Sequence, residues 1–153
     1  MAYDDNEHMP DEDRLRALLV GRSVTSAEVT DEKPEPYSAG PTGTLTLDDG
    51  TTLKVWGNDG GCAYDAGCYP LSALNAPGGV ITNVEVEAKP DEDYTCPECK
   101  AEGRDWWDDC PHRGWYRVFV VTADERTLLA SFDGSDGNGY YGTGWWLRVM
   151  DAA

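Results

Sequence analysis

Histidine is scarce in this chain of 153 residues, which holds only His8 and His112. Catalytic sites of the Ser/His/Asp or Cys/His type need a histidine as general base. However, His8 belongs to an acidic N-terminal segment and His112 to a cysteine cluster. The phosphate-binding GxxxxGK(S/T) loop, the GxGxxG dinucleotide motif and the HExxH zinc-protease motif are also absent. These absences predict a protein that has no catalytic residues and is not an enzyme.

Long apolar runs are lacking as well. No segment comes near the ~20 apolar residues of a membrane helix, and the opening MAYDDNEHMPDEDR has no apolar core of a signal peptide. A content of 40% hydrophobic residues, with six Trp and eight Tyr, nevertheless excludes a disordered chain. We therefore expect a cytoplasmic protein with a flexible acidic arm over residues 1–10 and a single domain over residues 11–153.

Basic residues are few, with 12 Lys and Arg against 29 Asp and Glu, and the formal net charge is −17. Nucleic-acid binding needs a basic surface, so this composition excludes direct contact with phosphates. Two interpretations of the acidity stay open. The carboxylates keep the protein soluble, or they imitate nucleic-acid phosphates and block the basic groove of a host DNA-binding or defence protein.

The strongest local signal is a hairpin over residues 43–56, GTLTLDDGTTLKVW. Alternating apolar residues flank a turn at Asp48-Asp49-Gly50, which is the pattern of two strands joined by a tight connection. The buried face of this hairpin is predicted to hold Leu45, Leu47, Leu53 and Val55.

Helical spacing of leucines before Gly21 predicts one helix over residues 11–20. A single helical turn is expected at residues 69–75. Alternation predicts further strands at residues 23–30, 80–87, 115–122, 126–132 and about 144–150. Because these strands lack crossover helices, the fold class is α+β. We expect a mainly antiparallel sheet, strongly twisted or closed like a barrel, with one N-terminal helix packed on it.

The most specific chemistry lies in CPECKAEGRDWWDDCPH, which spaces Cys96, Cys99, Cys110 and His112 as Cys-x2-Cys, x10, Cys-x-His. Three thiolates and one imidazole suit the tetrahedral shell of Zn²⁺, and four protein ligands leave no position for water or substrate. The motif therefore predicts one structural zinc ion, held in an insertion over residues 89–114.

Two tryptophans, Trp106 and Trp107, lie inside this insertion, next to Asp105, Asp108 and Asp109. In one interpretation both indoles cover the sheet beneath the metal. In the other, one exposed indole ringed by carboxylates is an anchor for a basic protein partner, because tryptophan often dominates interface energetics.

Two glycine-rich segments, GNDGGCAYDAGC and DGSDGNGYYGTGWW, also carry carboxylates and amides. Turns with positive φ explain the glycines, whereas the polar side chains suit a small-ligand site. Cys62 and Cys68 are compatible with buried thiols, metal ligands or a disulfide, since five cysteines cannot all pair. The candidate ligand residues are Asn58, Asp59, Cys62, Cys68, Asp133, Asp136 and Asn138.

Four phrases, RLRALLVGR, LTLDDGTTLKVWGNDGGC, CYPLSALNAPGGVITNVEVE and DGSDGNGYYGTGWWLRV, resemble a family of small proteins of unknown function carried by actinobacteriophages. The resemblance covers most of the chain from Arg14 onward. It implies an accessory protein made in the host cytoplasm, with no active site to transfer. We expect a non-enzymatic protein that binds a host or phage macromolecule. The alternatives are the acidic mimic and a small-ligand binder or enzyme that uses the glycine-rich segments.

Zinc content tests the metal site directly. Protein purified without chelator is expected to hold about one Zn²⁺ per chain by elemental analysis, and Cys99→Ser should lower this sharply because it removes a thiolate ligand. Cys62→Ser, outside the motif, is the control and should keep the metal. Metal-free wild-type protein would rule the site out.

Overall fold

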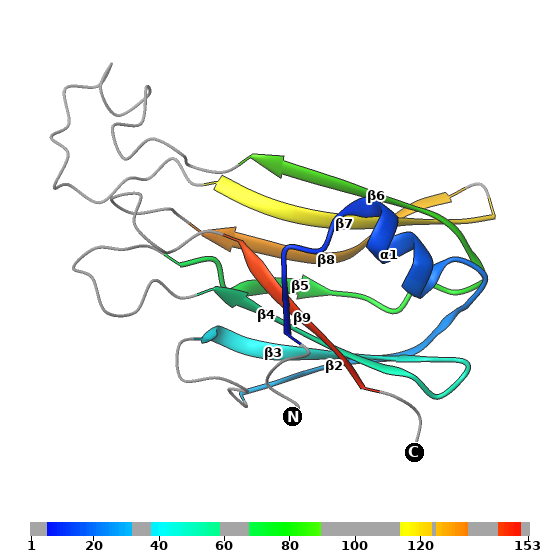
Figure 1. The fold of residues 1–153 in the computed structure, drawn as a ribbon, viewed down its shortest axis with the longest axis horizontal. Helices are drawn as coiled ribbons and strands as arrows, with labels where there is room; N and C mark the ends of the chain where they lie inside the picture. Colours follow the sequence, from blue (N-terminus) through cyan, green and yellow to red (C-terminus); the bar gives the residue numbers. More distant parts are fainter. Residues whose placement is uncertain are drawn as a thin grey trace, which may run out of the picture.

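The alternating apolar and polar residues of this chain form two antiparallel sheets that face each other (Figure 1). The computed structural model describes residues 6–31, 38–58, 68–89, 114–123, 125–134 and 144–150. One sheet consists of β1 (Asn6–His8), β9 (Trp145–Met150), β4 (Thr52–Asn58), β3 (Ser38–Leu47) and β2 (Val24–Thr30), in that order. The other consists of β5 (Leu71–Leu74), β8 (Glu125–Gly134), β7 (Gly114–Thr122) and β6 (Ile81–Lys89).

The core fills the space between the two sheets. Large side chains from both sheets meet there, including Tyr69, Phe132 and Trp145, which are at most 2% exposed. Phe132 and Trp145 stack with ring centroids 5.1 Å apart, and Tyr69 contacts Tyr116 edge to face at 4.8 Å. Such aromatic pairs add specific geometry to the apolar area that they bury.

The predicted hairpin is confirmed as β3 and β4, which pair from Thr46↔Thr52 to Ser38↔Asn58. Its four predicted core residues, Leu45, Leu47, Leu53 and Val55, are all 3% exposed or less. In the turn, the Asp49 carboxylate accepts a hydrogen bond from the Thr51 amide at 2.9 Å. Hydrogen bonds from Thr51 lower the pKa of Asp49, because they stabilise the ionised carboxylate.

The predicted helix is confirmed as α1 (Glu12–Leu19), which lies beside the edge strand β6 (Figure 1). Asp11 caps its first turn by accepting from the Arg14 amide at 2.8 Å. Its apolar side, Leu15, Leu18 and Leu19, is buried in the core. The Glu12 carboxylate accepts from the Val86 amide at 2.7 Å, so the helix satisfies part of the open edge of β6.

One expectation about the sheets is wrong. The strands of the described residues divide into two open sheets and do not form a single sheet closed like a barrel. The mainly antiparallel arrangement with an N-terminal helix is confirmed. Local patterns show which residues form strands, but strand partners are chosen by contacts between distant residues.

The helical turn predicted at residues 69–75 is also wrong, because Leu71–Leu74 form strand β5. A register shift lies between Leu71 and Ala73, so Leu71 pairs with Phe132 while Leu74 pairs with Ala130. A bulge of this kind places two leucines on the same side of a strand although they are three residues apart. Their spacing therefore resembles that of a helix.

The N-terminal residues 6–8, predicted to lie in a flexible arm, form β1 at the edge of the five-stranded sheet. The Met9 amide donates to the Trp145 carbonyl at 3.0 Å, and Arg148 donates to the Asn6 side chain at 2.7 Å. Met9 also packs against the core. The acidic composition that suggested an arm did not reveal these contacts.

Among the described residues, no helix is both long enough and apolar enough to cross a membrane.

Leu19, the last residue of α1, and Val20, the residue that follows the helix, offer a test of the packing of α1. Leu19→Ala should lower the free energy of unfolding by about 2–5 kcal/mol, because Leu19 is buried and its removal leaves a cavity. Val20→Ala is the matched control, and since Val20 is 41% exposed its effect should stay within about 0.5 kcal/mol. Chemical denaturation measures both. Equal effects would contradict the placement of α1 against the core.

Candidate functional site

The longest connections between strands leave from one end of the sandwich, which we call the loop end. In the five-stranded sheet, Asn58 pairs with Ser38 and Gly57 with Trp145. The segments 32–37, 59–67 and 135–143 therefore leave from neighbouring strands. In the other sheet, Lys89 and Gly134 lie opposite Trp115 and Gly114, so segments 90–113 and 135–143 leave together. The arrowheads of β4, β6 and β8 all point to this end in Figure 1.

A tight crossing of the main chain joins the two sheets at the loop end. The Tyr69 amide donates to the Asn58 carbonyl at 3.0 Å, and the Asn58 amide donates to the Gly144 carbonyl at 3.2 Å. The segment Cys68–Tyr69 passes so close that a Cβ on Gly57 would overlap the Tyr69 carbonyl, and one on Gly134 would overlap the Cys68 carbonyl. Glycine inside a strand is a signal for such an approach, and the sequence carries this signal at Gly57 within β4 and at Gly134 at the end of β8.

The negative charge of the chain is concentrated outside the strands. The described residues hold 12 acidic and eight basic side chains, a net charge of −4, out of the total of −17. The four segments at the loop end (32–37, 59–67, 90–113 and 135–143) hold 13 acidic and four basic side chains, a net charge of −9. The loop end is thus the most acidic part of the molecule.

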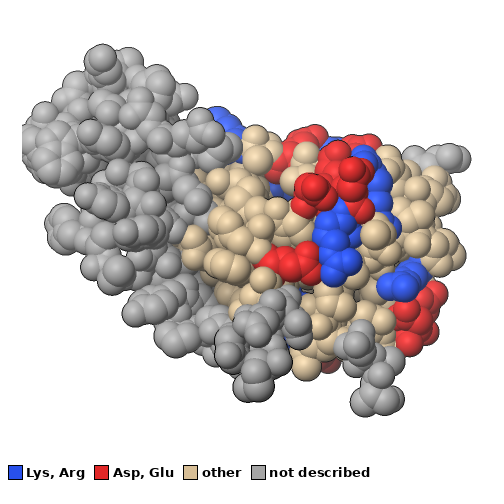
Figure 2. Space-filling view, viewed as in Figure 1, with Lys and Arg blue, Asp and Glu red and all other residues tan. Residues whose placement is uncertain are grey.

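At least seven of the 12 acidic residues that the structure describes are paired with arginine. Arg14 binds Glu7 at 2.9 Å, Arg22 binds Asp49 at 3.1 Å and Arg126 binds Glu85 at 2.6 Å. Figure 2 shows acidic and basic side chains side by side on one face of the molecule. Exposed pairs of this kind add little stability, but they leave the surface of the sandwich close to neutral.

Of the predicted ligand residues, the structure describes Asn58, Cys68 and Asp133, and it does not bring all three together. Asn58 lies next to Cys68, because the amide of the following residue, Tyr69, donates a hydrogen bond to the Asn58 carbonyl. The Asn58 side chain accepts from Trp146 at 3.2 Å on the outer face of the five-stranded sheet. Asp133 instead accepts from Ser72 and from Ser131 on the outer face of the four-stranded sheet. The side chains of Asn58 and Asp133 therefore lie on opposite faces of the sandwich.

The other predicted site residues lie outside the described residues, so the structure places none of them. They are Asp59, Cys62, Asp136 and Asn138 of the glycine-rich segments, the zinc ligands Cys96, Cys99, Cys110 and His112, and the tryptophan cluster of Asp105, Trp106, Trp107, Asp108 and Asp109. Within the part of the chain that is described, no group of three or more His, Cys, Asp or Glu side chains could hold a metal ion.

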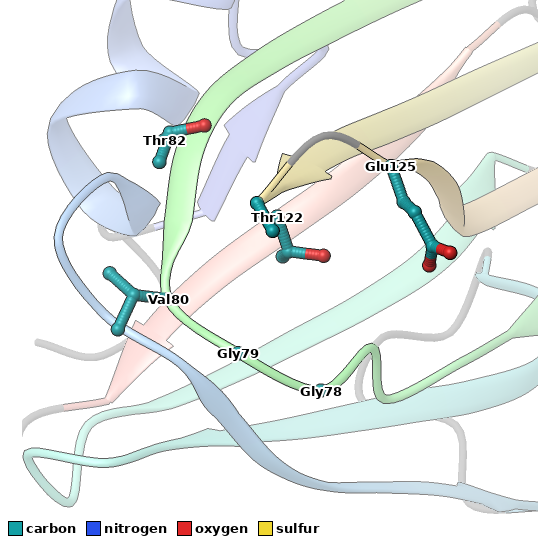
Figure 3. Close-up of a pocket in the computed structure, with 7 residues that line it drawn as sticks. Gly78, Gly79, Val80, Thr82, Thr122 and Glu125 are labelled. Atoms are coloured by element: carbon teal, nitrogen blue, oxygen red, sulfur yellow. The ribbon is translucent and has the colours of Figure 1, made fainter.

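An open cleft of about 640 Å³ lies at the opposite end of the sandwich. Figure 3 shows the turn between β7 and β8, with Thr122 and Glu125, facing the segment Gly78–Val80. Glu125 is the one ionisable side chain among the described residues that line the cleft, and Val80 is 54% exposed. A ligand site normally combines an enclosed apolar wall with several converging polar groups, and this cleft lacks both.

Comparison with known proteins finds one family. A domain of unknown function (DUF7448) matches residues 17–147. No curated protein and no solved structure matches the chain. The match includes the helix leucines Leu18 and Leu19 and every strand except β1, apart from the last residues of β9.

The crossing at the loop end can be tested with two glycine substitutions. Gly57→Ala should destabilise the fold by about 1–3 kcal/mol or more, because the new Cβ forces the Tyr69 main chain away. In Gly78→Ala the Cβ meets no atom within 4 Å, so stability should change by less than about 1 kcal/mol. Thermal unfolding compares them. Similar stability of both variants would show that the crossing is not tight in solution.

Proposed function

The chain belongs to the DUF7448 family of unknown function, and from its geometry we propose that it is a non-enzymatic binding protein whose loop end binds a basic macromolecule. The observation that carries this proposal is the separation of charge. A nearly neutral sandwich of strands holds, at one end, four connecting segments with a net charge of −9. Charge on one end orients an approaching partner and raises its association rate.

The architecture supports the same proposal. Binding residues are often placed on connections that a rigid scaffold holds in position. Here the scaffold is rigid where the connections begin, because Cys68–Tyr69 ties β4 to β8 and because Phe132 stacks on Trp145 between the sheets. The strand ends from which segments far apart in the sequence leave thus lie side by side, so that these segments can act on one partner.

The segment 90–113 is the longest of these connections, and its ends are anchored by the pairing of Lys89 with Trp115. Connections of this length are uncommon in compact domains, and where they occur they are often functional. We propose that Cys96, Cys99, Cys110 and His112 bind a structural Zn²⁺ that orders this segment. In such a segment, Trp106 and Trp107 would be presented with Asp105, Asp108 and Asp109 to the partner.

The likeness to actinobacteriophage proteins supports a more specific form of the proposal, in which the partner is a host or phage macromolecule in the host cytoplasm. An acidic nucleic-acid mimic is the second candidate, since its target would also be basic. The ion pairs of the scaffold argue for an ordinary protein interface, because Glu7, Glu85 and Asp49 are neutralised by arginine and do not form a regular row of charges.

Affinity capture from actinobacterial lysate tests the proposed function. Wild-type protein should retain a basic partner. The triple variant Asp105→Asn, Asp108→Asn, Asp109→Asn should weaken binding by roughly tenfold or more, with most of the loss in the association rate and with steep salt dependence in the wild type. Trp107→Ala should weaken partner binding further by raising the dissociation rate if the indole is an anchor.

The matched control changes exposed acids away from the loop end. Asp48→Asn, in the turn between β3 and β4, and Glu125→Gln, at the start of β8, lie at the opposite end of the sandwich and should leave capture unchanged. Zinc content and melting temperature must stay at wild-type values in the triple variant. Equal binding by the triple variant and the wild type would disprove the loop end as the binding surface. A partner that is a DNA-binding protein and is displaced by duplex DNA would instead favour the mimic.

A further inference from the structure

The described part of the chain leaves one long sheet edge open, that of β2. The edge strands of the two sheets are β1, β2, β5 and β6. β1 is three residues long, and β5 is four residues long with a register shift. β6 is covered by the main chain of Gly21 and Arg22, which exchanges hydrogen bonds with Ile81, and by the Glu12 carboxylate on the Val86 amide. Short strands, bulges and covers are devices that protect sheet edges from other chains.

β2 is protected in none of these ways beyond its first residues. It holds seven residues, VTSAEVT, without proline or lysine, and its register shift lies near its start, between Val24 and Ser26. From Ser26 to Thr30 it pairs evenly with β3, and no hydrogen bond from a described residue reaches its other side. Glu28, Val29 and Thr30 are exposed. Such an edge presents N–H and C=O groups that can pair with another extended chain.

The two sides of β2 differ in the side chains that an added strand would meet. Val29 pairs with Gly43 and Ala27 pairs with Leu45. Since Leu45 is buried, Val29 lies on the core side of the sheet, and Glu28 lies on the outer side. Val29 is nevertheless 53% exposed, so the four-stranded sheet does not cover the core side of β2 at this point. An added strand would place one residue beside Val29 and the next beside Glu28.

The acidic side chains at this edge are free, unlike most others of the sandwich. Seven of the described acids bind arginine, Asp11 caps α1, and Asp48 accepts from a serine hydroxyl. The remaining three, Glu28, Asp31 and Glu125, are exposed and have no hydrogen bond or ion pair with a described residue. Two of these three lie on β2 or directly after it, where β2 reaches the loop end (Figure 1).

We propose that the open edge of β2 binds an extended segment of the basic partner, which adds to the five-stranded sheet as a further strand. This inference rests on the proposed function, because it specifies how the partner at the loop end is held. Main-chain hydrogen bonds to the edge supply affinity, and alternate side chains supply selectivity. Apolar residues beside Val29 alternate with lysine or arginine beside Glu28, and a further basic residue reaches Asp31.

Charge separates this occupant from a second copy of the chain. A two-fold pairing of β2 with itself brings the free Glu28 and Asp31 of both copies to one edge and adds no basic residue to balance them. A basic strand, in contrast, neutralises these carboxylates. The outer faces of the sheets offer no such selection, because their acids are already paired within the chain.

A synthetic peptide of alternating valine and lysine, equal in length to β2, tests the edge on the full chain. Titration calorimetry should detect binding, and hydrogen exchange followed by NMR should slow at amides within residues 24–30, because the new strand pairs with them. The same peptide with N-methylated main-chain amides should not bind, nor should a peptide of alternating valine and glutamate. Failure of the valine–lysine peptide to bind, or binding without slower exchange in β2, would overturn the proposal.

Two matched pairs of variants assign peptide binding to β2. Val29→Lys should raise the peptide dissociation constant by roughly tenfold or more, because it sets a like charge against the lysines of the peptide. Val80→Lys makes the same change at a 54% exposed position of the opposite end and should leave the constant unchanged. Glu28→Gln should raise it by about twofold to fivefold, since an exposed ion pair contributes little, whereas Glu125→Gln should have no effect. Equal constants for Val29→Lys and Val80→Lys would refute binding at β2.

Lysate capture and sedimentation separate the remaining outcomes. Capture that depends on Asp105, Asp108 and Asp109 but is unaffected by Val29→Lys would show that the loop end holds the partner alone, which contradicts strand addition. Binding of the peptide by a chain that captures no partner would support the edge as a site for a basic strand while disproving the loop-end function. Dimers of the free chain that Val29→Lys abolishes would assign the edge to a second copy and contradict the proposal.

Discussion

The close approach of the Cys68–Tyr69 main chain to Gly57 and Gly134 is the contact on which the arrangement of the molecule depends. It joins the end of β4 in one sheet to the end of β8 in the other. Tyr69 is completely buried at this point and reaches Tyr116 in the core. Because the approach leaves no space for a Cβ, the two sheets are held at one distance where the long connections begin. The geometry of the loop end follows from this contact.

The charge of the chain is divided between two parts with different physical roles. The sandwich must bring strands together, and like charges on neighbouring strands would oppose this. Its described residues carry only −4, and arginines neutralise many of its acids. The four segments at the loop end together carry −9. Most of the negative charge therefore lies outside the described strands and the core.

The sequence alone determined features that depend on neighbouring residues. Helical spacing located α1, alternation located the hairpin of β3 and β4 with Leu45 and Leu53 in its core, and ligand spacing defined the zinc hypothesis. Only the tertiary structure decided the division into two sheets and the pairing of β1 with β9. It also decided that Leu71–Leu74 form strand β5 and not a helical turn. The same holds for the candidate sites. The sequence named residues of the segments at the loop end, but only strand register showed that the strand ends flanking them lie side by side, and that Asn58 and Asp133 face opposite sides. Contacts between residues distant in the chain depend on register and packing, for which a local pattern carries no signal.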